Sequence, residues 1–456
     1  MDTMTSFIGS VWWLVVSLGV LVTFHEFGHY WVARRNGVKV LRFSIGFGRP
    51  LWSRRGRDGT EYVIAAIPLG GYVKMLDERE TPVEAEEASQ AFNRKSVWQR
   101  IAIVIAGPAA NLLLCVLLLW AMFVIGRPDY APVVGVAQAV AAEAGLERGD
   151  VIQAVGERQT PTWNEVQLAL LPAALDRRDV ALEVIDGYGN RRTRTLPLSH
   201  LPADLDDRML LPSIGLLPRH FLAPPVVGAV RPDTPADGVL QPGDRITAID
   251  GQPVETFEQI GPLVQALGEA GATGMVEVER EGERLALEIA PRLAEDPERG
   301  DFWMLGIESD RSQAPPRDAV QRHGPIAAVP VALRETVHLT GQLFGMLGRA
   351  FSGRVAIENT VAGPITIARA ANAYANMGPA WYLSILALLS LSLAILNLLP
   401  IPLLDGGHLL YYLIELVKGS PLSERAMVAG QYVGLALLAS LMGLAFYNDI
   451  LQLIQR

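Results

Sequence analysis

Four segments of this chain are long and apolar enough to cross a lipid bilayer, and no other feature restricts the fold as strongly. A helix that spans a membrane needs about 20 residues that are mostly apolar. The chain has 456 residues, 50% of them hydrophobic, and a mean hydropathy of +0.25. The four segments are residues 7–24, 102–125, 381–404 and 426–447. The sequence therefore predicts a polytopic α-helical membrane protein with four transmembrane helices.

The first of these segments is predicted to remain as a transmembrane helix and not to be cleaved as a signal peptide. A signal peptide carries basic residues before its apolar centre. Here Asp2 precedes the apolar run, whereas Arg34, Arg35 and Lys39 follow it. Because basic residues favour the cytoplasmic side, we expect the N-terminus to lie outside the cytoplasm.

The distribution of Lys and Arg predicts the orientation of the other segments. Residues 34–100 are rich in both, so this loop should be cytoplasmic. Residues from about 127 to 379 then lie outside, and Lys418 and Arg425 mark a second cytoplasmic loop before the last span. The net charge of −9 argues against a nucleic-acid partner. The one cysteine, Cys115, lies in the second span, so we expect no disulfide.

The outer segment contains an internal repeat. Residues 133–135 recur as residues 226–228, and a Gly-Asp turn at Asp150 recurs at Asp244. The spacing of roughly ninety residues exceeds that of solenoid repeats and fits a duplicated small domain. These two α+β modules resemble PDZ domains, which bind an extended peptide and capture its C-terminal carboxylate. The alternative is that they are rigid spacers without affinity for peptides.

The loop after the first span is predicted to contain a β-hairpin. Residues 61–67 are apolar and rich in strand-forming side chains, and residues 40–51 would be their partner. Their apolarity suggests a sheet that dips into the membrane, shielded by protein because exposed strand edges would leave backbone groups unpaired in lipid. Residues 325–351 are amphipathic, which predicts a helix at the membrane interface.

These patterns divide the chain into nine regions. They are the first span (1–36), the hairpin region (37–96), the second span (97–126), two PDZ-like domains (127–221 and 222–312), the interfacial region (313–378), the third span (379–408), a cytoplasmic loop (409–425) and the last span (426–456).

The end of the first span carries the sequence His25-Glu26-Phe27-Gly28-His29. Residues four apart share one face of a helix, so both imidazoles can bind one metal ion while Glu26 acts on a water molecule. Ionisable groups in a span are costly and usually functional, although such groups can also reach the interface without any role. The motif predicts a zinc hydrolase whose third ligand comes from another span.

Asp405 is the leading candidate for the third ligand. It lies at the inner end of the third span, which runs in the same direction as the first span. Pro400 and Pro402 interrupt the helix just before it. His408 is the alternative ligand. A transporter or metal carrier, or a scaffold with an inactive site, are the competing functional classes, because ionisable groups in spans also mark ion pathways.

The order of several motifs resembles the site-2 protease family of intramembrane metalloproteases over nearly the whole length of the chain. They are residues 25–29, the Gly-Phe-Gly of residues 46–48, residues 67–75, residues 106–111 and the Leu-Asp-Gly of residues 404–406. The resemblance implies that His25, His29 and Asp405 bind one zinc ion and that Glu26 is the acid and base of peptide hydrolysis.

The resemblance also implies where substrates bind. The hairpin would hold the substrate as an extended strand, and Asn397 would hydrogen-bond its backbone. The candidate hairpin contacts are Glu61, Tyr62, Val63, Ile64, Ala65, Gly70 and Gly71. The expected substrates are single-span proteins of the anti-sigma-factor type in a bacterial inner membrane, cut after a first extracytoplasmic cleavage in an envelope stress response, with signal-peptide remnants as an alternative. The termini and both modules would be periplasmic.

Overall fold

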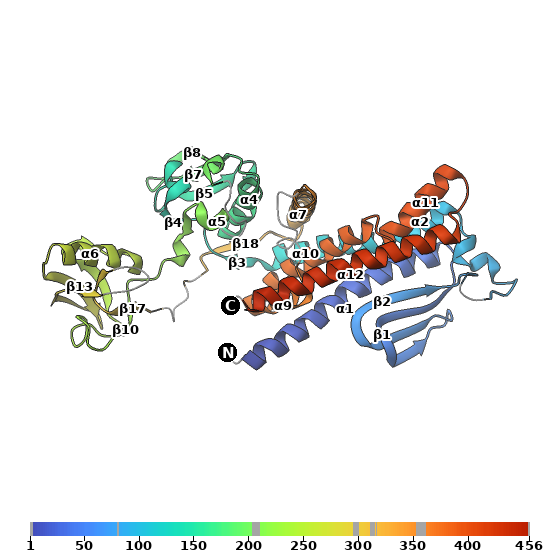
Figure 1. The fold of residues 1–456 in the computed structure, drawn as a ribbon, viewed down its shortest axis with the longest axis horizontal. Helices are drawn as coiled ribbons and strands as arrows, with labels where there is room; N and C mark the ends of the chain where they lie inside the picture. Colours follow the sequence, from blue (N-terminus) through green and yellow to red (C-terminus); the bar gives the residue numbers. More distant parts are fainter. Residues whose placement is uncertain are drawn as a thin grey trace. The chain divides into compact units, whose positions relative to one another are not determined.

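The computed structural model describes residues 3–79, 82–202, 210–294, 301–310, 315, 317–352 and 362–454. The chain forms two compact units, coloured along the sequence in Figure 1. One unit consists of Met1–Arg127 together with Gln321–Arg456, and the other of Pro128–Val320. The interfacial region expected at residues 313–378 lies partly outside the described residues, at 313, 314, 316 and 353–361.

Within its described residues, the first unit contains four helices that are long and apolar enough to cross a membrane, as expected. They are α1 (Thr3–Arg35), α2 (Val97–Ile125), α10 (Pro379–Leu398) and α12 (Glu424–Ile454). The expected extent of the third span, to residue 404, is wrong because the helix ends at Leu398. Pro400 and Pro402 follow directly, and proline cannot continue the hydrogen-bond ladder of a helix.

A further helix, α11 (Asp405–Lys418), occupies much of the stretch where we expected a loop at residues 409–425. The expectation failed because α11 is amphipathic and too polar to look like a span. Its buried residue Tyr412 packs near α2, and Glu415 pairs with Arg100 at 2.7 Å. Both partners of that ion pair are about nine-tenths buried. This pair therefore fixes α11 against α2.

Helix α2 lies between α1 and α10 and packs closely against both. Leu21, Leu114 and Leu386, one from each helix, belong to one buried cluster. The hydroxyls of Ser17 and Tyr382 are 2.9 Å apart, so the middle of α1 lies beside the start of α10. Residues that come later in α1 lie beside residues that come later in α10, so these two helices run in the same direction. Helix α2 runs in the opposite direction.

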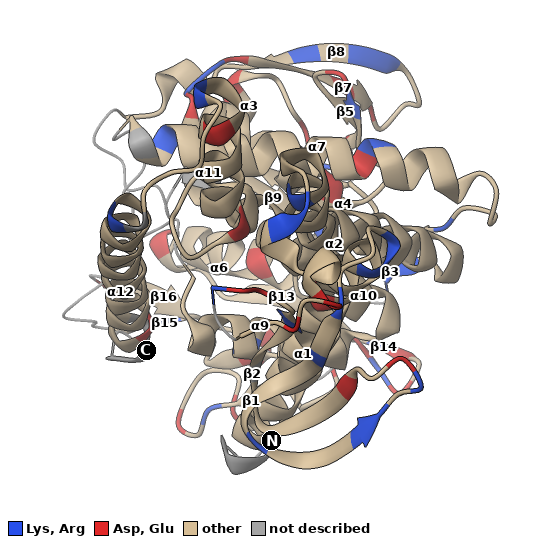
Figure 2. Ribbon diagram, turned by 90° about the vertical axis from the view of Figure 1, so that its right-hand side faces the viewer, with Lys and Arg blue, Asp and Glu red and all other residues tan. Residues whose placement is uncertain are grey.

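Helix α12 packs only lightly on the rest of its unit. Only 6% of the most apolar 18-residue stretch of α12 is buried, compared with 50% for the corresponding stretch of α2. The charged residues of α12 lie near its two ends (Figure 2). Near its C-terminus the buried Asp449 accepts hydrogen bonds from the backbone N–H of Ile365 at 2.8 Å and the hydroxyl of Thr366 at 2.6 Å. Asp449 therefore caps helix α9 (Pro364–Met377), whose own first turn lacks a capping side chain.

Helix α7 (Ala328–Phe351) has the amphipathic pattern that the sequence predicted. Its buried side includes Ala328 and Ala332, which belong to a cluster with residues of α2 and α10. Its exposed apolar side chains include Leu333 and Val337. An interfacial position for this helix remains a prediction.

The predicted hairpin is a sheet of two long, bent strands, β1 (Val40–Arg55) and β2 (Glu61–Met75). Residues 42–45 pair with residues 61–64 on one side and with residues 71–74 on the other, and residues 50–55 pair with residues 61–65. The segment order across the sheet is thus 50–55, 61–65, 42–45, 71–75. Gly46 and Gly48 have φ angles of 92° and 88°, which allow β1 to bend between its two halves.

The second unit contains two modules with the same strand order, as the internal repeat predicts. The first has the sheet β6-β5-β7-β8 and the second the sheet β12-β11-β13-β14. Each has a separate buried core. The sheet strands and main helices are β5 (Val151–Val155), β6 (Arg158–Gln159), α4 (Trp163–Leu175), β7 (Val180–Ile185), β8 (Arg191–Leu196), β11 (Arg245–Ile249), β12 (Gln252–Pro253), α6 (Ile260–Glu269), β13 (Gly274–Arg280) and β14 (Glu283–Ile289).

Smaller elements connect these sheets to the rest of the chain. They are η1 (Ala88–Gln90), η2 (Phe92–Arg94), β3 (Arg127–Asp129), β4 (Val134–Ala137), α3 (Ala139–Glu143), η3 (Leu198–His200), α5 (Leu210–Ser213), β9 (Leu216–Pro218), η5 (Arg219–Phe221), β10 (Val227–Val230), η6 (Phe257–Gln259), β15 (Arg292–Ala294), β16 (Phe302–Met304), β17 (Ile307–Ser309) and β18 (Ala319–Gln321). Strand β4 pairs with β9 in the first module, and β10 pairs with β17 in the second.

The repeated Gly-Asp pair has the same structural role in both modules. Asp150 accepts a hydrogen bond from the backbone N–H of Glu147, and Asp244 accepts one from that of Gln241. Arg280 also donates to Asp244 at 2.7 Å. Burial alone would raise the pKa of Asp244, but the hydrogen bonds from Arg280 and the backbone outweigh it, so the pKa lies below its ordinary value. The pair stabilises the turn that precedes each first sheet strand.

Candidate metal centre

The zinc motif lies in the last third of α1, on the side that faces α2. Because His25 and His29 are four residues apart, both imidazoles project from the same face of the helix. The two residues are 8% and 9% exposed, respectively, and Glu26 between them is half-buried. Buried imidazoles and a carboxylate within a membrane span require polar partners, which the neighbouring segments supply.

The structure brings Asp405 to both histidines. Its Oδ2 lies 3.1 Å from Nε2 of His25 and 3.4 Å from Nε2 of His29, and the two Nε2 atoms are 3.2 Å apart. Four tetrahedral ligand atoms at 2.0–2.1 Å from zinc would be separated by roughly 3.3 Å. The three atoms thus form a triangle of the size that a zinc ion requires.

The hydrogen bonds around the triangle also favour a cation. Nδ1 of His29 is 2.8 Å from the carbonyl oxygen of Ile103, which can only accept, so Nδ1 must carry the proton. In a neutral imidazole Nε2 then carries a lone pair and cannot donate to the carboxylate of Asp405. Two lone pairs directed at each other repel unless a positive ion lies between them. The residues present therefore fit zinc.

His408, the alternative third ligand, is not part of this group. Its ring is exposed and packs edge-on against Tyr411, with centroids 6.1 Å apart. Among the described residues, the group of His, Cys, Asp and Glu side chains with metal-ligand spacing consists of His25, His29 and Asp405.

Close backbone packing between α1 and α2 gives the two imidazoles their positions. A Cβ atom on Gly107 would lie 2.2 Å from Nε2 of His29 and 2.8 Å from Cε1 of His25. A Cβ atom on Gly28 would lie 2.2 Å from the carbonyl oxygen of Ala106. Both distances are far below van der Waals contact, so these two glycines are needed for the helices to approach and for the rings to lie as they do.

The segment between α10 and α11 places Asp405 at the first residue of a helix. Leu403 has a φ of 84°, which is rare for a leucine and marks local strain next to the candidate ligand. A Cβ atom on Gly406 would lie 2.1 Å from the carbonyl oxygen of Leu399. One on Gly407 would lie 2.5 Å from that of Ile401. The two glycines after Asp405 therefore let α11 begin directly against the preceding backbone.

The hairpin sheet approaches Glu26 through its last segment. A Cβ atom on Gly71 would lie 3.1 Å from Cγ of Glu26, and the backbone of Val73 forms a hydrogen bond with the Glu26 carboxylate. Residues 71–75 pair with β1 on one side and have no strand on the other among the described residues. The free edge of the sheet nearest the candidate base is thus this segment.

The expectation that a substrate pairs along residues 61–67 is wrong for residues 61–64. Residues 61–64 are paired on both sides, so their backbone groups are not available as an edge. The error arose because the folded course of β1, which turns back on itself at Gly46 and Gly48, cannot be read from hydrophobic alternation. Of the candidate contacts, Gly70 and Gly71 lie at the start of the free edge, Glu61, Tyr62, Val63 and Ile64 lie inside the sheet, and Ala65 pairs on one side with Pro50.

Two of these inner residues already have partners within the chain. Glu61 accepts a hydrogen bond from Arg42 at 2.8 Å, and the Tyr62 hydroxyl is 2.7 Å from that of Tyr30. Burial and this contact raise the pKa of Tyr62 to about 12, so its hydroxyl stays protonated. Asn397 lies half-buried in the last turn of α10, before the segment that leads to Asp405.

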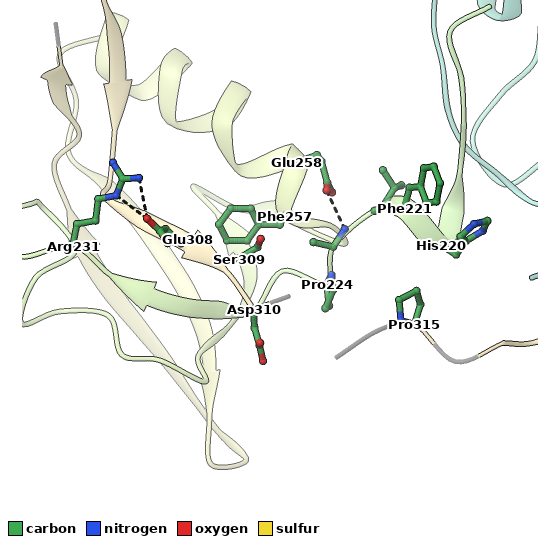
Figure 3. A pocket seen from close by; sticks show the side chains of 12 residues that line it. His220, Phe221, Pro224, Arg231, Phe257, Glu258, Glu308, Ser309, Asp310 and Pro315 are labelled. Atoms are coloured by element: carbon green, nitrogen blue, oxygen red, sulfur yellow. Dashed lines mark hydrogen bonds and ion pairs between the residues drawn. The ribbon is translucent and has the colours of Figure 1, made fainter. Parts of the chain in front are cut away.

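A separate open pocket of about 780 Å³ lies in the second unit, where η5 and the following residues meet the second module (Figure 3). Its apolar lining includes Phe221, Leu222 and Phe257. Arg231, a cation that could attract a peptide carboxylate, pairs with Glu308 at 2.9 Å. An incoming carboxylate would have to compete with that ion pair. Peptide binding by the modules remains a prediction.

Comparison with known proteins gives matches over almost the whole chain. A model of peptidase family M50 matches residues 13–441. The chain is 56% identical to a protein of Xylella fastidiosa (strain Temecula1 / ATCC 700964) named "Putative zinc metalloprotease", across 98% of this chain and 100% of that protein. It is 43% identical to "Regulator of sigma-E protease RseP" of Escherichia coli (strain K12), across 99% and 100%. The PDZ domain of the SdrC-like protein from Listeria innocua is similar to 20% of this chain, with 26% identity and a TM-score of 0.17.

Proposed function

This chain belongs to peptidase family M50, and from that premise we propose that it cleaves single-span membrane proteins in or beside their transmembrane segment. It is an intramembrane zinc metalloprotease. The observation that carries the proposal is the triangle of His25, His29 and Asp405 at the buried end of α1. One relative is named "Regulator of sigma-E protease RseP", which favours substrates of the anti-sigma-factor type in an envelope stress response.

We propose that Glu26 is the acid and base of the reaction. His25, His29 and Asp405 would hold a zinc ion, which would supply a Lewis acid for a peptide carbonyl and make water a stronger acid. The carboxylate of Glu26, next to both ligands in sequence, accepts the proton that water loses as it attacks the carbonyl carbon. It then donates this proton to the amine nitrogen as the C–N bond breaks. His25, His29 and Asp405 hold the centre in place and exchange no proton.

Removal of the metal tests the proposal directly. We expect purified protein in detergent to cleave a single-span test protein, to lose this activity after treatment with a chelator, and to regain it on addition of one equivalent of zinc. An Asp405→Ala variant should fail to regain activity because it lacks one of three ligands. Chelator-resistant cleavage, or full recovery by the Asp405→Ala variant, would contradict the assignment.

We propose that the substrate pairs with the free edge of residues 71–75. A transmembrane helix hides its carbonyls in its own hydrogen bonds, so it must unwind before cleavage, and a strand edge can replace the lost bonds. This edge is favoured because it lies beside Glu26. Asn397 would hydrogen-bond the backbone of the same unwound segment.

Proline at the free edge should weaken substrate capture. Met75→Pro removes one backbone donor of this edge and leaves the bond between Val73 and Glu26 intact, and a hydrogen bond of about 1.4 kcal/mol corresponds to roughly a tenfold loss in kcat/KM. Ser53→Pro, on the opposite outer segment, is the control and should change kcat/KM by less than about threefold. Zinc content is measured for both. Equal losses in the two variants, or no loss in Met75→Pro, would rule out capture at this edge.

We propose that the two outer modules restrict access to substrates already shortened by a first protease. The modules contain none of the residues of the metal centre, so they can select substrates but not cut them. With their periplasmic placement, and the termini on the same side of an inner membrane, they would meet the outer domain of a substrate first.

Replacement of residues 128–320 by a flexible linker tests this role. We expect the shortened protein to cleave both full-length and trimmed substrates, whereas the intact protein should prefer the trimmed form by at least about tenfold. The comparison uses both substrates at equal concentration in the same membranes, with the Glu26→Gln form of each protein as background. An unchanged preference in the shortened protein would show that selection lies elsewhere.

A further inference from the structure

We propose that Asn111 is a positioning residue of the metal centre, whose amide oxygen accepts a hydrogen bond from Nδ1 of His25 and so fixes this imidazole as a ligand. Asn111 lies on α2 and is 0% exposed. Its Nδ2 lies 3.3 Å from Nδ1 of His25. Its Oδ1 is buried and has no hydrogen-bond partner in the described part of the chain.

Metal ligation by His25 determines which atom of the amide must face it. Nε2 of His25 is the atom that lies in the triangle with His29 and Asp405. A ligating nitrogen needs its lone pair, so the single proton of the neutral ring is on Nδ1. Nδ1–H and the Nδ2 amino group are both donors and cannot bond to each other. Rotation of the amide by 180° puts Oδ1 in that place and gives an N–H···O hydrogen bond.

The second imidazole has the equivalent arrangement, made by the same helix. Nδ1 of His29 donates to the carbonyl oxygen of Ile103 at 2.8 Å. Helix α2 thus orients both rings through their Nδ1 atoms. A backbone carbonyl contacts Nδ1 of His29, and a side-chain amide contacts Nδ1 of His25. On the other side of α2, the backbone carbonyl oxygen of Asn111 accepts a hydrogen bond from the hydroxyl of the buried Ser390 on α10 at 2.8 Å.

Two substitutions separate this role from simple packing. Asn111→Leu keeps about the same side-chain volume and removes the acceptor, whereas Asn111→Asp keeps an acceptor at the same place. Zinc affinity of the purified full-length protein is measured by competition with a chromogenic chelator, and zinc per chain by metal analysis. We expect Asn111→Leu to weaken zinc binding by about 10–100-fold, the usual cost of losing a partner of a ligating histidine. Asn111→Asp should bind zinc at least as tightly as the unmodified protein.

Ser390→Ala is the matched control. It removes a buried hydrogen bond at the same residue without touching the amide, so zinc affinity should stay within about twofold of the unmodified protein. If Asn111→Leu retains normal zinc affinity, or if Asn111→Asp weakens binding as much as Asn111→Leu, the inference is overturned. If a thermal unfolding assay shows that Asn111→Leu does not fold, the test rests on Asn111→Asp. A tenfold loss of zinc affinity in Asn111→Asp would then overturn the inference.

This inference rests on the metal centre proposed above, and the two fail in different ways. If the unmodified protein takes up no zinc, the metal centre itself is refuted. If the protein binds zinc at His25 and His29 but its affinity does not depend on the acceptor at residue 111, only the role of Asn111 is lost.

Discussion

Glu26→Gln is expected to lower the rate of peptide cleavage by about 10²–10⁴-fold while zinc remains bound. Glutamine has nearly the shape of glutamate but cannot accept the proton of the attacking water. His25, His29 and Asp405 are unaltered, so the ligand triangle persists. The rate is measured on a single-span substrate in detergent or in membranes, together with zinc per chain by metal analysis.

The zinc measurement separates the loss of a base from the loss of the centre. Glu26→Asp is the companion variant, since it retains a carboxylate on a shorter side chain and should recover part of the rate. Full activity of Glu26→Gln would refute the assignment of the base, and so would a loss of zinc equal to the loss of rate.

Gly107→Ala is expected to weaken zinc binding by about 100-fold or more, although it adds only one methyl group. The new Cβ would lie 2.2 Å from Nε2 of His29 and 2.8 Å from Cε1 of His25, so both rings would have to move from the triangle. Substitution of a residue that orients one metal ligand usually lowers metal affinity 10–100-fold, and this change displaces two ligands. Affinity is measured by chelator competition, and cleavage should fall in parallel.

Gly19→Ala provides the control for a glycine replaced within a membrane helix. It lies on α1, and a Cβ atom there would meet nothing within 4 Å. Zinc affinity should be unchanged, and stability should change by no more than about 1 kcal/mol, in the favourable direction for a helix interior. Normal zinc binding by Gly107→Ala would show that α1 and α2 can separate, and that their close contact does not fix the rings.

The helices and the meeting of the candidate ligands followed from the sequence because each depends on strong local signals. Four long apolar runs predict four membrane helices, and the spacing of His25 and His29 places both on one face. Because the first and third spans were predicted to run in the same direction, Asp405 was expected at the same membrane depth as the two histidines. The structure brings the three side chains within one group, and His408 stays outside it.

Features that depend on tertiary packing could not be predicted in the same way. The sheet order of the hairpin depends on β1 turning back on itself at its two glycines, so the free edge was assigned to residues 61–67 and not to residues 71–75. Helix α11 was missed because its stability comes from burial of Tyr412 and the ion pair of Glu415, contacts distant in sequence. The positions of Gly107 and Asn111 behind the imidazoles were likewise visible only when α1 and α2 were packed together.

The membrane unit is assembled from the two ends of the chain, and the residues of the second unit lie between them in the sequence. During synthesis, a ribosome would therefore release His25 and His29 into the bilayer long before it made Asp405. A nascent or truncated chain would hold two of three ligands and could not hydrolyse its neighbours. The protease would therefore become active only after the last third of its own chain has been synthesised and inserted into the membrane.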